Sequence, residues 1–295
     1  MLRDTTARLL ISCADGPGIV AAVSNFLFHH GANITALDQY STDPEGGRFF
    51  MRLEFQTPHL DLSRTLLYQS FQDTVAARYE MDWRISFSRD VKKVAILVSK
   101  YDHVLNELLW RWSRGEMEAE VTLVLSNHAD LKNTVESFNV PFYHIPVSSS
   151  MDSADTGANK AEVEKNILAL LNGRADLVVL ARYMQVLSED FVSRYENKII
   201  NIHHSFLPAF VGANPYFQAH ERGVKIIGAT AHYVTKELDM GPIINQDVAH
   251  VSHSDDVNDL KEKGRNVERN VLAQAVNWHL EDRIIVNGNK TIVFS

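Results

Sequence analysis

The chain has 295 residues, of which 45% are hydrophobic and 22% charged, the balance of a globular protein with room for two domains. Its net charge of −8 disfavours a broad surface for nucleic acid or an anionic membrane, so a small molecule is the expected ligand. The single cysteine excludes an intramolecular disulfide, and the first residues are too short and too interrupted for a signal peptide or membrane span. We therefore expect a cytoplasmic protein.

Residues 1–88 predict a first domain with two helices and four strands. A glycine-rich turn, "DGPG", opens an amphipathic helix that ends at Gly31, and two alternating segments around "DPEGG" indicate a β-hairpin. The order βαββαβ is the ferredoxin-like arrangement. The expected strands are Thr5–Cys13, 33–42, 48–56 and Met81–Ser88, and the second helix is Leu62–Tyr79.

The turn and the helix of this first domain resemble the ACT domain, a small-molecule regulatory module. The shared residues are Asp15, Gly16, Gly18 and Ile19, followed after the helix by Gly31, Asn33 and Ile34. The alternative is that the glycines only shape a turn from strand to helix. The resemblance implies a homo-oligomer, with subunits paired through sheets or helices. It also implies a possible amino-acid effector, with Asp15, Gly18 and Asn33 as candidate ligands.

Residues 89–295 predict a second domain with a mainly parallel, doubly wound sheet. The short apolar segments "VAILVS", "VTLVLS", "FYHIPV" and "DLVVLA" are separated by helical stretches, which is typical of a sheet covered on both faces. The polar connection "PVSSSMDSADTGANK", residues 146–160, is expected to be a surface loop. A final amphipathic helix over 260–283 precedes a hairpin around Asn287 and Gly288.

The segment "NKIINIHHSFLP" places polar side chains where a strand of this sheet ends. Because side chains alternate along a strand, Asn201 and His203 face the same side, at the edge where such sheets bind ligands. A later turn carries Asp239 and is able to fold over the same edge. An amide, an imidazole and a carboxylate suit attack on a carbonyl carbon. The alternative is that Asn201 and His203 only satisfy the strand end.

The motifs of this second domain resemble those of enzymes that move a formyl group from 10-formyltetrahydrofolate. The matching motifs are N-x-H-x-S-x-L-P in "NIHHSFLP" and L-D-x-G-P in "LDMGP", and the resemblance runs from Val94 to the end. It implies that Asn201, His203 and Asp239 are catalytic. It also implies a folate site near the loop after "VVLA" and near the facing loop, with Met184, Gln185, Val186, Leu187, Lys236 and Glu237 as candidates.

The alternative for Met184, Val186 and Leu187 is that their apolar side chains belong to the core. The thirteen histidines form no obvious metal framework, so no metal and no redox cofactor are expected, with 10-formyltetrahydrofolate as substrate.

The turn "VSKYDHVLNELLW" helps to decide which molecule accepts the formyl group. There is no glycine from Val91 to Arg114, and Asp102 places negative charge where the phosphate of a glycinamide nucleotide would bind. The acidic chain likewise disfavours a tRNA acceptor. Over its whole length the chain is similar to the formyltetrahydrofolate deformylases, which implies hydrolysis to formate and tetrahydrofolate, supplying formate for purine biosynthesis and balancing one-carbon pools.

Two alternatives remain open: formyl transfer to an amine acceptor such as glycinamide ribonucleotide, and a non-catalytic folate or amino-acid sensor. His103 is expected either to cap its helix or to fill acceptor space. In the hypothetical mechanism, Asp239 holds water and accepts its proton, and Asn201 and His203 stabilise the oxyanion. A proton then reaches the folate nitrogen through His203 or Asp239, in an order that the sequence leaves unassigned.

Overall fold

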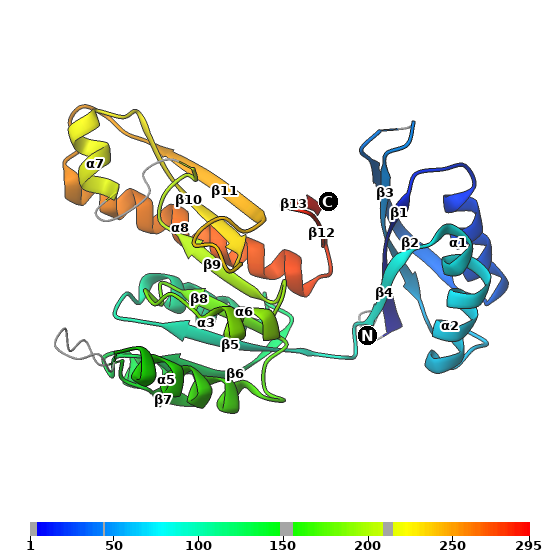
Figure 1. Ribbon diagram of the computed structural model, residues 1–295, viewed down its shortest axis with the longest axis horizontal. Helices are drawn as coiled ribbons and strands as arrows, with labels where there is room; N and C mark the ends of the chain where they lie inside the picture. The colour runs from blue at the N-terminus through cyan, green and yellow to red at the C-terminus, as the bar shows by residue number, and fades with distance from the viewer. Residues whose placement is uncertain (1–4, 44, 148–155, 209–214) are drawn as a thin grey trace. The chain divides into compact units, whose positions relative to one another are not determined.

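The structure, a computed structural model, describes residues 5–43, 45–147, 156–208 and 215–295. It divides into two compact units (Figure 1). The first unit comprises residues 1–91, 282–287 and 292–295, and the second comprises 92–281 and 288–291. The sequence analysis placed the whole chain after residue 88 in the second domain, whereas these contacts group two short C-terminal segments with the first unit.

The first unit has the predicted βαββαβ order around a four-stranded antiparallel sheet, in the strand order β2-β3-β1-β4. Figure 1 shows both helices on one side of this sheet. A π-helical turn and a 3₁₀ turn continue the second helix to Tyr79, where the sequence predicted its end. The elements are β1 (Thr6–Ala14), α1 (Ile19–His29), β2 (Asn33–Ser41), β3 (Arg48–Gln56), α2 (Arg64–Phe71) and β4 (Asp82–Phe87).

Helix α1 packs on the sheet through the apolar face that its spacing predicts. Ile19, Val23 and Leu27 are buried in the core of the unit, at intervals of four residues. The helix is followed by Gly31, whose φ is +76°, and a Cβ there would overlap the backbone carbonyl of His59. Only glycine fits this turn, which returns the chain to β2.

The second unit is built on a seven-stranded sheet in the order β11-β10-β9-β8-β5-β6-β7. Strands β5 to β9 are parallel to one another, and β10 is antiparallel to both β9 and β11. The strands are β5 (Lys92–Val98), β6 (Ala119–Ser126), β7 (Phe142–His144), β8 (Leu177–Ala181), β9 (Ile199–His203), β10 (Ile226–Tyr233) and β11 (Ile243–His250).

The connections between these strands are mainly helical. The helices are α3 (His103–Ser113), α4 (Lys132–Glu136), α5 (Thr156–Leu171), α6 (Glu189–Arg194), α7 (Pro215–Arg222) and α8 (Val257–Leu280). From β5 the chain moves outward to β6 and β7, then crosses back to β8 on the other side of β5. The sheet therefore has a topological switch point between the carboxyl ends of β5 and β8, where ligands of such sheets bind.

The prediction of a loop over residues 146–160 is partly wrong, because α5 begins at Thr156. Residues 148–155 lie outside the described ranges. Val163, Ile167 and Leu171 are buried on one side of α5, and this packing supports a helix that extends into the polar "TGANK". Local composition favoured a loop there, and tertiary packing outweighed it.

The C-terminal elements agree with the sequence in type. Helix α8 begins at Val257, slightly earlier than predicted, because Asp256 and Asp259 form a capping box. The final hairpin pairs β12 (Ile284–Asn287) with β13 (Lys290–Val293). Within the described ranges, no helix is both long and apolar enough to cross a membrane.

Candidate active site

The carboxyl end of β9 carries Asn201 and His203, as predicted. In the antiparallel pairing with β10, Asn201 lies opposite His232 and His203 lies opposite Thr230. Residues directly opposite in such a pair share one face of the sheet. Asn201 Nδ2 is accordingly 3.2 Å from His232 Nε2. The two strands therefore present an amide and two imidazoles together.

The loop after β10 brings Asp239 to these side chains. Asp239 Oδ2 lies 3.2 Å from His203 Nδ1, and Oδ1 lies 3.5 Å from His232 Nε2, so one carboxylate spans both imidazoles. Gly241 lets the loop approach β10, because a Cβ there would overlap the carbonyl oxygen of Tyr233. The structure thus brings together the three predicted side chains, which we call the Asn–His–Asp trio.

The two histidines set the charge of Asp239. Hydrogen bonding by His203, and then by His232, holds the pKa of this carboxyl well below its usual range, although burial acts in the opposite direction. Asp239 is therefore ionised throughout the neutral range. A carboxylate with so low a pKa is a poor proton acceptor, but it orients and stabilises a neighbouring imidazolium well.

The hydrogen bonds leave two groups of the site open. His232 Nδ1 donates to the carbonyl of Tyr233 at 2.9 Å, so Nε2 of the neutral ring accepts one Asn201 N–H, whereas Nε2 of the protonated ring donates to Asp239. The second N–H of that amide remains for a ligand. His203 Nε2 is buried and has no hydrogen-bond partner among the described residues. An oxygen of a substrate or of water would satisfy both groups.

The predicted folate-binding residues fall on two loops. Residues 182–188 connect β8 to α6, and there Met184 and Val186 are 57% and 54% exposed. Leu187 instead packs against the core of the unit, and Gln185 is half-buried. Lys236 and Glu237 are exposed on the loop that carries Asp239.

Positive φ angles mark the same two loops. Of the seven non-glycine residues with positive φ among the described residues, three lie on these loops: Arg182, Met184 and Asp239, with φ of +61°, +57° and +56°. Such conformations cost a non-glycine residue about 1–3 kcal/mol and cluster where a site demands them. They therefore support a functional role for both loops.

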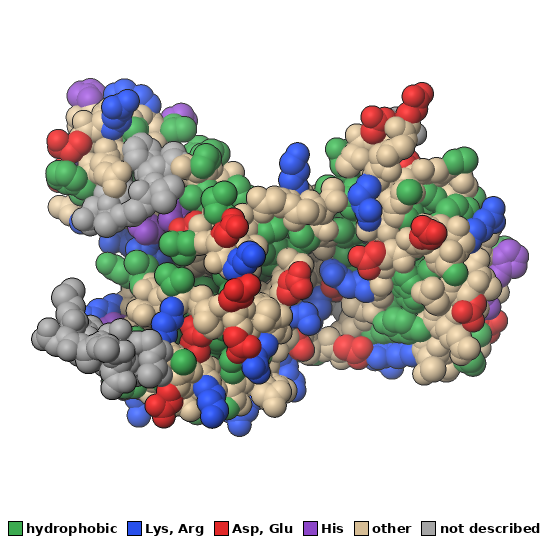
Figure 2. Space-filling view, in the orientation of Figure 1, with side chains coloured by type: hydrophobic (Ala, Val, Ile, Leu, Met, Phe, Trp, Pro, Cys, Tyr) green, Lys and Arg blue, Asp and Glu red, His purple; other side chains and the backbone are tan. Residues whose placement is uncertain are grey.

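A cavity of about 470 Å³ lies beside Asp239, within the range of small-molecule sites. Figure 2 shows hydrophobic side chains reaching the surface of the second unit among charged ones. The cavity is lined mainly by apolar residues of the loops after β9 and β10 and by the turn of the last hairpin. They are Leu207, Pro208, Leu238, Asp239, Met240, Gly241, Ile243, Asn289, Lys290 and Thr291.

Two parts of the site were missed from the sequence. His232 was not among the predicted site residues, since its contact with Asn201 depends on a register that the sequence does not reveal. His103 does not cap its helix: it is buried, and its Nε2 lies 2.9 Å from Glu268 Oε2. Among the described residues, no group of three His, Cys, Asp or Glu side chains is placed to hold a metal ion.

The effector candidates of the first unit do not all lie together. Asp15 accepts hydrogen bonds from the N–H of Gly16, at 2.8 Å, and from the Ser41 hydroxyl. Gly18, with φ of +87°, precedes α1 near the same end of β1. Asn33 pairs with Gln56, which pairs with Thr6 at the beginning of β1. Within one subunit Asn33 is therefore at the opposite end of the sheet from Asp15.

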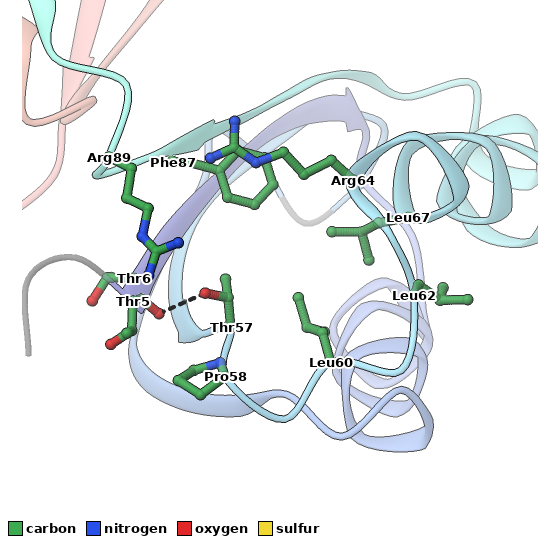
Figure 3. A pocket seen from close by; sticks show the side chains of 10 residues that line it. All are labelled: Thr5, Thr6, Thr57, Pro58, Leu60, Leu62, Arg64, Leu67, Phe87 and Arg89. Carbon is green, nitrogen blue, oxygen red and sulfur yellow. Dashed lines mark hydrogen bonds between the residues drawn. The ribbon is translucent and has the colours of Figure 1, made fainter.

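A smaller cavity of the first unit, about 260 Å³, lies at that opposite end (Figure 3). Arg64 lines it and is already engaged, since its guanidinium lies 4.0 Å from the centre of the Phe87 ring and 2.8 Å from Asp90. The lining residues are Thr5, Thr6, Thr57, Pro58, Leu60, Leu62, Arg64, Leu67, Phe87 and Arg89.

Comparison with known proteins covers both units. Residues 92–276 match the formyl transferase family, and residues 7–64 match the ACT domain. The formyltetrahydrofolate deformylase of Bacillus subtilis is 54% identical over 98% of this chain and 93% of its own length. The crystal structure of a formyltetrahydrofolate deformylase from Pseudomonas syringae pv. tomato superposes with a TM-score of 0.92, at 46% identity over 98% of this chain and 94% of that one.

A more distant similarity covers part of the chain. Glycinamide ribonucleotide transformylase 1 from Symbiobacterium toebii aligns with a TM-score of 0.62 at 29% identity, covering 70% of this chain and 95% of that one.

Proposed function

The chain belongs to the formyltetrahydrofolate deformylases, and we propose that the Asn–His–Asp trio of its second unit carries the reaction of that family. The enzyme hydrolyses 10-formyltetrahydrofolate to formate and tetrahydrofolate. The resemblance drawn from the sequence is thereby confirmed, and so is the fold of both units. The convergence of Asn201, His203 and Asp239 on one sheet edge is the observation that carries the proposed mechanism.

In the first step, the oxygen of water bonds to the formyl carbon while His203 Nε2 takes the proton. The low pKa of Asp239 makes the carboxylate the weaker candidate for this role, so we revise the sequence-based hypothesis in favour of the imidazole. Asp239 then stabilises the imidazolium through Nδ1. The open N–H of Asn201 stabilises the negative charge on the formyl oxygen, a contribution of about 3 kcal/mol for such donors.

In the second step, the bond between the formyl carbon and folate N10 breaks. The imidazolium of His203 returns its proton to N10, and formic acid loses its own proton to solvent, which leaves formate, tetrahydrofolate and one released proton. N10 is attached to an aryl ring and is a weak base, which makes it an adequate leaving group. The formate produced would supply purine biosynthesis, and the tetrahydrofolate would return to the one-carbon pool.

For substrate binding we propose that the folate lies in the cavity beside Asp239 and along the loop of Met184 to Leu187. Exposed apolar side chains flanking a polar site are typical of a surface that a ligand covers. Lys236 and Glu237, exposed on the facing loop, are proposed as polar contacts. The two proposed steps need no metal and no redox cofactor. We expect the enzyme to act in the cytoplasm.

The first unit is proposed to regulate the second and to assemble subunits. Edge strand β2 supports assembly, because each of its residues is exposed or half-buried, including Leu37 and Tyr40 at 40% and 49% exposure. A possible amino-acid effector is expected near Asp15 and Gly18, where β1 meets α1. Asn33 would join such a site only from another subunit.

One assay tests the activity and separates the alternatives. Formate release is measured from 10-formyltetrahydrofolate with no amine acceptor present, then again with added glycinamide ribonucleotide. We expect release at an unchanged rate in both conditions. A sensor protein would release none, and a transferase would consume folate only after the amine is added.

A further inference from the structure

The switch point of the sheet in the second unit opens beside the Asn–His–Asp trio. Ser99 follows β5, His103 begins α3, and Arg182 follows β8. Since Leu180 pairs with Asn201, Arg182 follows β8 at the same edge of the sheet at which His203 ends β9. A molecule held at this switch point would therefore lie next to the reacting carbonyl.

A buried carboxylate fills that position in this chain. Glu268 of α8 is 1% exposed, with Oε2 at 2.9 Å from His103 Nε2 and at 3.5 Å from Arg182 Nη1. Its Oε1 accepts a hydrogen bond from the Tyr216 hydroxyl at 2.8 Å. Gly264, one turn earlier in α8, makes room for that hydroxyl, since a Cβ there would overlap it. We call Glu268, His103, Arg182 and Tyr216 the Glu268 cluster.

The cluster leaves hydrogen-bond donors open. Arg182 is 8% exposed, and its Nε and Nη1 are buried with no hydrogen-bond partner among the described residues. His204 links the cluster to the trio, because its ring lies 5.3 Å from that of His203 and 6.2 Å from that of Tyr216. The cluster thus combines a buried anion with two Arg182 nitrogens that lack a hydrogen-bond partner among the described residues, and His204 lies between it and the catalytic imidazole.

Stability alone is a poor reason for this arrangement. A buried ion pair contributes little compared with apolar residues of the same volume, and each unsatisfied buried donor costs about 1–3 kcal/mol. A small molecule that accepts hydrogen bonds would remove that cost. Water fits such a position, whereas the phosphate of a nucleotide amine would meet the carboxylate of Glu268.

We propose that the Glu268 cluster selects the acceptor by occupying the switch point and reserving the open donors of Arg182 for water. This inference rests on the proposed function. With water, the formyl carbon gains a bond to oxygen, its bond to N10 breaks, and formate leaves. With an amine, a carbon–nitrogen bond forms instead, N10 again takes a proton, and a formamide leaves.

The test is the partition of formyl groups between water and an amine. The variant Arg182→Gly/Glu268→Gln removes both charges together and opens the crevice, and glycine suits the φ of +61° at position 182. With glycinamide ribonucleotide added, we expect the formamide share of the products to rise at least tenfold over the wild type. The matched control is Lys263→Gln, which removes a surface ion pair with Asp255 from the same helix and should leave the share unchanged.

Two further results decide the inference. If the double variant fails to fold, His103→Gln, which keeps an N–H donor, serves instead, with an expected rise of at least threefold. The cluster's role in selecting the acceptor would be overturned if a folded variant with the wild-type KM for the folate gave the same formamide share of products as the wild type. A wild type that releases no formate at all would instead contradict the proposed function.

Discussion

The two units differ in where they bury polar groups. In the first unit the buried ionisable side chains Arg52 and Asp282 both form hydrogen bonds, and the predicted effector residues Asp15 and Asn33 lie near the surface at opposite ends of the sheet. In the second unit five ionisable side chains are buried near the carboxyl ends of the parallel strands β5, β8 and β9. They are His103, Arg182, His203, His232 and Glu268.

This difference agrees with the proposal that the second unit carries the reaction and that the first unit regulates it. Buried polar groups lower stability unless they are fully paired, so a fold keeps them where chemistry requires them. In the second unit, His203 Nε2 and two nitrogens of Arg182 are buried without a hydrogen-bond partner among the described residues. The contrast predicts that comparable substitutions have very different effects in the two units.

The largest contrast is expected between two carboxylates. Asp239→Asn keeps the shape of the side chain but removes the charge that orients His203, so formate release should fall by about 10³-fold. Asp15→Asn, the matched change in the first unit, should alter the rate less than twofold without an effector. Steady-state assays at saturating folate measure both, and similar losses in the two variants would contradict the comparison.

A smaller loss is expected on removing the amide of the trio. Asn201→Ala deletes the N–H assigned to the oxyanion and should lower kcat by about a hundredfold, the usual effect of one such donor. Since the charge develops only in the transition state, KM should change little. A raised KM with unchanged kcat would make Asn201 a ground-state contact.

The pH dependence of stability should come from the second unit as well. Burial, and then the charge of Arg182, lowers the pKa of His204 from 6.5 to about 4. The unfolded chain therefore binds more protons than the folded one between these values, so stability falls as pH drops from 6.5 towards 4. The loss from this group is at most about 3 kcal/mol.

His204→Gln should remove that part of the acid sensitivity. Denaturant unfolding at pH 7 and at pH 4.5, followed by tryptophan fluorescence, compares the variant with the wild type. An equal loss of unfolding free energy in both proteins would show that His204 is not the group responsible.

Within the second unit, a smaller effect on rate than that of either trio substitution is expected for His232, which acts through Asn201 and Asp239. His232→Gln should lower kcat roughly tenfold by loosening both partners. As a positioning residue, it should leave the pH profile of kcat unchanged in shape. A profile that loses a titration in this variant would assign His232 a direct proton transfer.

The sequence predicted the elements of both units because local patterns determine them. Alternation placed Asn201 and His203 on one face, and the four-residue spacing of Ile19, Val23 and Leu27 gave the buried face of α1. The prediction for the start of α5 was wrong because "TGANK" has the composition of a loop. The helix there depends on packing that begins only at Val163.

The remainder of the site depends on contacts between distant segments. His232 meets Asn201 through the register of β9 and β10, and Glu268 meets His103 across 165 residues of sequence. Neither pairing leaves a local signal. A glycine in the middle of α8, Gly264, was a visible clue, because a helix interior seldom keeps glycine without a packing reason.

The central claim is spatial, and a structure with a bound ligand tests it most directly. The ligand is an unreactive folate analogue that carries a 10-formyl group. We predict that its formyl oxygen lies about 3 Å from Asn201 Nδ2, with the formyl carbon beside His203 Nε2. A formyl group bound elsewhere, with Asn201 and His203 still turned to their protein partners, would contradict the account.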